Sequence, residues 1–86
     1  MRIGVSLSST YLVDDHAEGA RRLIERARVA RDAGLDSVSL GDQHSMAIPY
    51  YQGVAMLGRL TAEWDPSRAL GCLFLLPLWN PVVVAE

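Results

Sequence analysis

The chain opens with alternating apolar and small residues, a pattern that is typical of a β-strand. Over residues 2–7, isoleucine, valine and leucine alternate with glycine and serine, as expected where successive side chains face opposite sides of a sheet. Residues 35–40 show the same kind of alternation. Residues 69–76 are an almost unbroken apolar run, which is typical of a strand covered on both faces. The sequence therefore predicts three strands.

A helix is predicted between the first two strands. Asp15, followed three residues later by Glu18, predicts a capping box at its start, and Gly34 predicts a left-handed residue just after its end. Charged pairs three or four residues apart predict a solvent-exposed outer face. The residues that follow helical spacing in this segment are Ala20, Leu23, Ile24, Ala27, Ala30 and Arg31.

A second helix is predicted to begin at Pro49, because proline is favoured at the first helical position. The polar residues 42–48 form the loop before it, and residues 65–67 are predicted to end it at Pro66, which cannot continue a helical hydrogen-bond ladder. The side chains predicted to mark one side of this helix are Tyr50, Val54, Leu57, Thr61 and Trp64.

The alternation of strands and helices predicts right-handed crossovers and a parallel sheet. A doubly wound open sheet and a closed (β/α) barrel share this order. The chain has no glycine-rich phosphate or dinucleotide motif, and small inward faces beside a bulky third strand favour the barrel. The residues of these small faces are Gly4, Ser6, Ser8, Ser37, Ser39 and Gly41. The predicted fold class is α/β, with residues 1–86 as the N-terminal βαβαβ portion of a single, truncated (β/α)8 TIM barrel.

The last residues begin a new amphipathic element and stop within its first turns, after Pro81. We therefore expect the chain to be the N-terminal third of a longer barrel and to be inactive by itself. The alternative is a complete, small, non-catalytic α/β protein. Such a protein would have to self-associate, because its unpaired strand edges and its apolar third strand would otherwise be exposed.

Composition narrows the classes of protein further. Half of the 86 residues are hydrophobic and 21% are charged, which indicates a single globular domain. The net charge is −2 and every basic residue is arginine, without a basic stripe, so no nucleic-acid partner is expected. The single cysteine, Cys72, excludes an intrachain disulfide and a multi-cysteine zinc site. With no signal-peptide core or membrane span in the sequence, we expect a soluble cytoplasmic protein.

Four stretches carry a resemblance to a known family. They are the opening strand at residues 2–7, the turn at residues 33–36, the second strand end at residues 38–45 with Asp-Gln-His, and residues 76–86 with Trp-Asn-Pro. Together they resemble the bacterial luciferase-like monooxygenase superfamily. The resemblance implies an oxidoreductase that uses reduced FMN with oxygen, or the deazaflavin coenzyme F-420 for hydride transfer. It also implies a small-molecule substrate and a homodimer in the full-length parent.

The resemblance points to a site at the end of the second strand. Family members have an acidic residue there, followed by one or two histidines; the matching residues are Asp42, Gln43 and His44. His44 is the expected catalytic residue, since imidazole titrates near neutrality and can donate a proton. Asp42 and Gln43 are expected to contact the cofactor.

Other interpretations of these three residues remain open. Gln43 stands where many members have a histidine, so the family histidine is either replaced by His44 or lost, and an inactive partner subunit is a third possibility. Without the resemblance, His44 is a loop histidine that caps a helix or faces water, and Asp42 is a turn former. No third ligand accompanies them, so no metal is expected.

The family also has a non-proline cis peptide late in the third strand, against the cofactor. By position the resemblance places it at Cys72–Leu73, and both residues are expected to bind the cofactor. By itself Cys72 is more typical of a small apolar core residue. Trp79 is expected to pack at the start of the last helix, and His16 is expected to face solvent.

Overall fold

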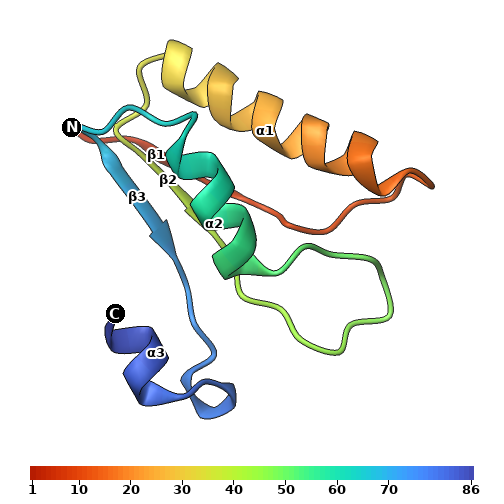
Figure 1. Cartoon of the computed structure of the whole chain (residues 1–86). Helices are drawn as coiled ribbons and strands as arrows, with labels where there is room; N and C mark the ends of the chain where they lie inside the picture. The colour runs from red at the N-terminus through yellow and green to blue at the C-terminus, as the bar shows by residue number, and fades with distance from the viewer.

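The computed structural model describes all 86 residues. Three parallel strands alternate with two longer helices, and a short helical segment follows (Figure 1). In chain order the elements are β1 (Gly4–Leu7), α1 (His16–Asp32), β2 (Ser37–Leu40), α2 (Gly53–Thr61), β3 (Ala69–Cys72), a 3₁₀ turn (Leu76–Leu78) and α3 (Pro81–Ala85). The chain is thus a small α/β domain with a parallel sheet, as the sequence predicts.

The strands lie in the order β1-β2-β3, and every neighbouring pair is parallel. The register aligns Val5 with Val38 and Leu70 across the three strands. Two positions further along, it aligns Leu7 with Leu40 and Cys72. All three strands begin within three residues of their predicted starts, but the third is shorter than expected. It ends at Cys72 because the backbone N–H of Leu75 donates to the carboxylate of Asp42, which turns the chain out of the strand direction.

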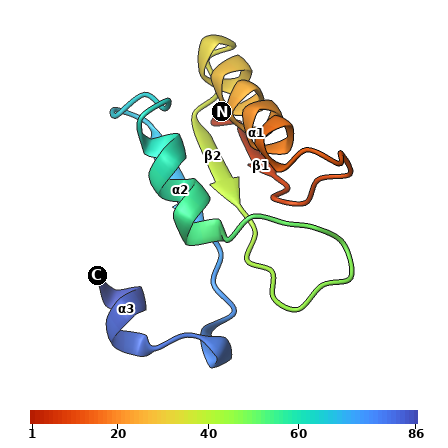
Figure 2. The same ribbon diagram turned by 45° about the vertical axis from the view of Figure 1, so that its right-hand side comes forward.

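Both long helices cover the same face of the sheet (Figures 1 and 2). One continuous core lies between them and that face, and its buried members are Leu7, Leu23, Ala27, Ala30, Val38, Leu40, Met56, Leu60 and Trp64. Along each strand, small residues alternate with the residues that face the core. The small residues Ser6, Ser39 and Gly71 therefore lie on the face that has no helices. The winding is therefore one-sided, whereas a doubly wound sheet has helices on both faces.

The first helix follows its prediction closely. Asp15 caps it, its Oδ1 accepting from the backbone N–H of Ala17 at 2.9 Å. The reciprocal half of the capping box is absent, because Glu18 accepts instead from Arg21 and Arg22 on the outer surface. Gly34 follows the helix with φ +82°, the left-handed conformation that glycine adopts without strain.

The predicted start of the second helix at Pro49 is wrong, and so is most of its predicted inner side. The carbonyl of Pro49 accepts from the backbone N–H of Tyr11 at 3.1 Å, and Tyr50 pairs antiparallel with Thr10. This pairing of the two loops keeps residues 49–51 extended, so the helix begins at Gly53. Its buried residues are Gly53, Met56 and Leu60, while Val54 and Thr61 face outward.

Arginine contacts join the two helices near the amino ends of the strands. Arg28 and Arg59 donate to Glu63 at 2.8 and 2.6 Å. Arg68 donates to the backbone carbonyls of Arg31 and Leu35 at 3.0 and 2.8 Å, which connects the turn before β3 to the end of α1 and the start of β2. The charged outer face predicted for the first helix is therefore partly a connection to the second helix.

Glu63 should make the fold sensitive to acid. Its two arginine partners lower its pKa from 4.5 to about 2, so its stabilising contribution is complete above pH 4.5 and is lost as the pH falls toward about 2. We expect Glu63→Gln to flatten the decrease in unfolding free energy across this window, measured by urea denaturation at successive pH values. Asp14→Asn, which changes an exposed carboxylate that makes no ion pair, is the matched control and should leave the slope intact.

Candidate functional site

The candidate residues of the second strand lie at the carboxyl end of the sheet. Residues 42–44 directly follow β2, and residues 73–79 follow the neighbouring β3. Parallel strands end at the same edge, and this edge is where α/β proteins bind ligands. The loop after β1 and the loop after β2 also run side by side there, as both views show (Figures 1 and 2).

Asp42 is the centre of this edge. Its side chain is only 1% exposed, and its Oδ2 accepts from the backbone N–H of Leu75 at 2.8 Å and from the indole N–H of Trp79 at 2.6 Å. Burial raises the pKa of Asp42, but these two donors and the ring of His44 outweigh it, so the net pKa lies below its usual range. The carboxylate is therefore charged at neutral pH and connects the end of β2 to the segment after β3.

His44 lies against the other oxygen of the same carboxylate. Its Nε2 is 2.8 Å from Oδ1 of Asp42, and its side chain is 24% exposed. The contact is an ion pair when the ring is protonated. Both atoms are buried and have no other hydrogen-bond partner. The Trp79 ring lies edge-on to the imidazole, with 5.8 Å between ring centroids. The structure thus brings two of the predicted residues into one partly accessible pair.

Gln43 does not join this pair. Its Oε1 accepts from the hydroxyl of Ser9 at 3.2 Å, and Ser9 is the most buried polar residue of the chain. The contact holds the loop after β1 against the end of β2. The position that carries a histidine in many members of the resembled family is here occupied by a residue that connects two loops.

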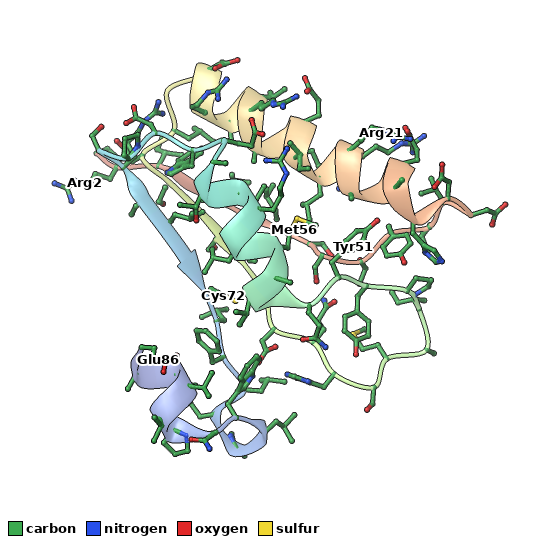
Figure 3. All side chains as sticks on the ribbon, viewed as in Figure 1. Arg2, Arg21, Tyr51, Met56, Cys72 and Glu86 are labelled. Carbon is green, nitrogen blue, oxygen red and sulfur yellow. The ribbon has the colours of Figure 1, made fainter.

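The side chains of Cys72 and Leu73 lie in different environments at the end of β3. The thiol of Cys72 packs against the first turn of α2 at Gly53, where an added Cβ would lie 3.0 Å from Sγ (Figure 3). Burial, with a smaller contribution from Asp42, raises the pKa of this thiol, so it stays protonated at neutral pH. The side chain of Leu73 is exposed, while its backbone N–H donates to Leu40 at 2.9 Å.

The predicted cis peptide at Cys72–Leu73 is wrong, since all peptide bonds of the chain are trans. Leu73 continues the regular hydrogen bonding of β3 to β2, which a trans peptide allows without a bulge. Cys72 lies with the residues that pack against the core, which agrees with its reading as a small apolar residue.

Trp79 and Phe74 complete the site and were not predicted as parts of it. Phe74 lies edge-on to Trp79, with ring centroids 5.3 Å apart, and Trp79 contacts both Asp42 and His44. Asn80 caps α3 by accepting from Val82 at 2.9 Å, which fixes the backbone directly after Trp79. The Trp-Asn-Pro sequence signals the helix start, but not the contact of the indole with a carboxylate 37 residues away.

A second cluster lies below the start of α1. Tyr11 and Tyr51 stack with ring centroids 4.4 Å apart, Tyr11 hydrogen bonds to Nδ1 of His16 at 2.6 Å, and Tyr51 donates to the carbonyl of His16 (Figure 3). His16 is exposed, as expected, but it is also held by this bond. An added Cβ at Gly19 would overlap the Tyr51 hydroxyl, so glycine at this position lets α1 pack closely against the two tyrosines.

Other features of the surface lie apart from the site. The largest hollow, of about 510 Å³, lies on the charged outer face of α1 near Arg59, away from Asp42. No three histidine, cysteine, aspartate or glutamate side chains gather as they would around a metal ion. None of the helices has both the length and the apolar character needed to span a bilayer.

Comparison with known proteins gives no relative: no family model, no curated protein and no solved structure matches this chain. The likeness to luciferase-like monooxygenases therefore stays a prediction from the four stretches of sequence. The fold and the site define the class of the protein. It is a parallel α/β domain whose two long helices cover one face of the sheet, with an Asp–His–Trp cluster at the carboxyl ends of its strands.

Proposed function

We propose that the chain is the N-terminal part of a luciferase-like barrel oxidoreductase, a cytoplasmic enzyme that uses FMN with oxygen or coenzyme F-420 on a small-molecule substrate. The observation that carries the proposal is the Asp42–His44 contact at 2.8 Å beside Trp79. It lies at the carboxyl ends of parallel strands, where barrel enzymes have their active sites. A full-length parent of this kind would be a homodimer.

The winding of the sheet supports a barrel. A barrel grows by adding each strand on the same side of the last, with every helix outside, and here β1, β2 and β3 follow in order with α1 and α2 on one face. The opposite face carries only small side chains in its central row, Ser6, Ser39 and Gly71. Small residues on this face leave space inside a closed barrel for larger side chains from other strands.

His44 is the proposed proton donor. Its Nε2 lies 2.8 Å from the Asp42 carboxylate, and 24% of the side chain is exposed, so part of the ring can meet a ligand. The hydrogen bonds from Leu75 and Trp79 fix the orientation of the Asp42 carboxylate. The carboxylate in turn fixes the position of the His44 ring. When bound, the cofactor would supply hydride transfer or oxygen activation.

The residues present suit a planar cofactor ring. Trp79 and Phe74 meet at 88°, and their faces offer apolar surface against which an aromatic ring can pack. His44 and the two aromatic side chains are the groups expected to contact that ring, while Asp42, with 1% of its side chain exposed, holds His44 and Trp79 in place. Cys72 lies under α2, so it would act by shaping the floor of the site, and Leu73 would contribute its exposed side chain.

The two tryptophans allow a direct test of cofactor binding. Trp79 lies at the proposed site, whereas Trp64 is buried beyond α2, near Arg68. With Trp64→Phe, Trp79 is the single reporter, and we expect saturable quenching of its fluorescence by FMN or by F-420. With Trp79→Phe, Trp64 is the single reporter, and its quenching at saturation should be weaker because it lies beyond α2 and not at the site. Absence of saturable quenching by both cofactors contradicts the proposal when the longest form of the protein that its source produces is used, because the chain is proposed to be only the N-terminal part of the barrel.

A specific observation favours a second function, a non-catalytic domain that acts by association. Both outer strands pair on one side only, and large apolar side chains around β3 and α3 are exposed. Soluble domains seldom expose contiguous apolar surface of this kind without a partner. The quenching experiment separates the two functions, because association alone requires no cofactor.

A further inference from the structure

A separate pocket lies beside the carboxyl end of β1, between the loop that follows this strand and one side of α1. Its volume is about 350 Å³, which is within the range of small-molecule sites. Leu12 and Val13 give it an apolar part. Its polar wall consists of Ser8, Thr10, Arg22 and Arg26. None of these residues belongs to the Asp–His–Trp cluster, so the pocket is a second feature of the same end of the sheet.

The wall of this pocket is positively charged. It contains two arginines and no acidic side chain. Each of the other three hollows of the chain has at least one carboxylate in its wall, and the whole chain has a net charge of −2. A concave surface with one sign of charge favours a ligand of the opposite sign. The pocket is therefore suited to an anion.

Arg26 is the arginine of α1 that has no carboxylate partner. Every other arginine of this helix forms an ion pair, whereas Arg26 forms none and is exposed. Arg22 lies one helical turn earlier and binds Glu18 through its Nε at 3.2 Å, so its two terminal nitrogens remain able to donate to a ligand. The planar guanidinium group matches the spacing of phosphate oxygens.

Two hydroxyls supply a further donor. The hydroxyl oxygens of Ser8 and Thr10 share one hydrogen bond of 2.7 Å, and the backbone N–H of Thr10 donates to the Ser8 hydroxyl at 3.3 Å. The shared bond uses one hydroxyl proton, so the proton of the other hydroxyl can be donated to a ligand. Thr10 also pairs with Tyr50 of the neighbouring loop, which gives this donor a defined position.

We propose that this pocket binds the phosphate group of a small organic molecule, with Arg22 and Arg26 on its oxygens and a further hydrogen bond from the hydroxyl pair of Ser8 and Thr10. The phosphate belongs either to the cofactor or to a phosphorylated substrate, and the recognition is the same. The site is inferred from its own side chains and does not depend on the proposed chemistry. It agrees with a barrel, in which β1 adjoins the eighth strand and the loops after strands seven and eight frequently bind phosphate.

A direct test titrates inorganic phosphate, at constant ionic strength, into the longest form of the protein that its source produces. Saturable changes are expected in the NMR signals of the backbone amides of Thr10 and Gly19, which both line the pocket. Arg26→Gln should weaken the binding about tenfold or more, because hydrogen bonds between charged groups are lost. Ser8→Ala combined with Thr10→Val removes both hydroxyls and should weaken it about fivefold.

Arg21→Gln is the matched control for Arg26→Gln. Arg21 is also an exposed arginine of α1, but it lines a different hollow on the outer side of the helix (Figure 3). This variant changes the net charge equally and should leave Kd for phosphate within about twofold, because salt screens distant surface charges. The phosphate site is overturned if phosphate causes no saturable change. It is also overturned if the two variants weaken binding equally, since that result indicates a general attraction to the charge of α1.

FMN and riboflavin differ by the phosphate group and identify its source. If the pocket takes the cofactor's phosphate, FMN should quench Trp79 of the Trp64→Phe variant at lower concentrations than riboflavin does, and Arg26→Gln should abolish this difference. If Arg26→Gln weakens the binding of inorganic phosphate and leaves FMN binding unchanged, the pocket serves a phosphorylated substrate. Absence of quenching by FMN and F-420 with phosphate binding retained contradicts the proposed function and supports the phosphate site alone.

Discussion

Replacing Asp42 with alanine is expected to release residues 73–79 from the end of β2 and to lower the free energy of unfolding by about 3 kcal/mol. The side chain is 1% exposed and accepts from Leu75 and Trp79. Hydrogen bonds to a charged group contribute about 1.5–3 kcal/mol each, and water recovers part of this loss because Leu75 lies at the surface. Urea denaturation measures the change, and Trp79 fluorescence should shift to the red as the indole loses its partner.

Matched variants separate the charge from the shape of this side chain. Asp42→Asn keeps an acceptor for one donor but loses the charge. We therefore expect its free energy of unfolding to lie between those of the unchanged chain and the alanine variant. Asp14→Ala removes an exposed carboxylate that makes no contact of this kind and should change stability by less than about 0.5 kcal/mol. The connecting role of Asp42 is contradicted if its alanine variant matches Asp14→Ala and leaves Trp79 emission unchanged.

The parts of the fold that sequence reasoning predicted are those fixed by neighbours along the chain. Alternation in β1 and β2 places Val38 and Leu40 on the buried face, and Asp15 and Gly34 bound α1 through contacts within a few residues. Local chemistry decides these features, so a local pattern reveals them.

The parts that sequence reasoning missed depend on contacts between distant segments. Pro49 is compatible with a helix start, but its carbonyl is held by Tyr11 of another loop. The apolar run after Cys72 is compatible with a longer strand, but Asp42 draws the chain away at Leu75. In both cases a backbone hydrogen bond from outside the element outweighs the intrinsic preference of the segment.

The candidate site divides in the same way. Asp42 and His44 are two residues apart, so their contact could be anticipated once the strand end was located. Trp79 reaches the same carboxylate across 37 positions, and Ser9 reaches Gln43 across 34. Only the parallel order of the strands, which collects their carboxyl ends at one edge, brings these residues together.

The second large effect is expected at His44. If His44 donates the proton, His44→Ala should lower kcat about 10²-fold or more in the longest form of the protein that its source produces. KM for the substrate should change little, because the imidazole acts on the proton and contributes little to binding. Saturable quenching of Trp79 in the same variant would show that the cofactor still binds, so that the loss is assigned to the chemical step.

The chain offers a matched control, because it contains one other histidine. His16 is exposed at the start of α1 and bonds to Tyr11, so His16→Ala removes the same side chain away from the carboxyl edge and should leave kcat within about twofold. Equal losses in the two variants would indicate a general effect on the fold. Full activity of His44→Ala with the cofactor bound would show that the proton comes from another group, and the 2.8 Å contact between His44 and Asp42 would then serve to hold the loop after β2.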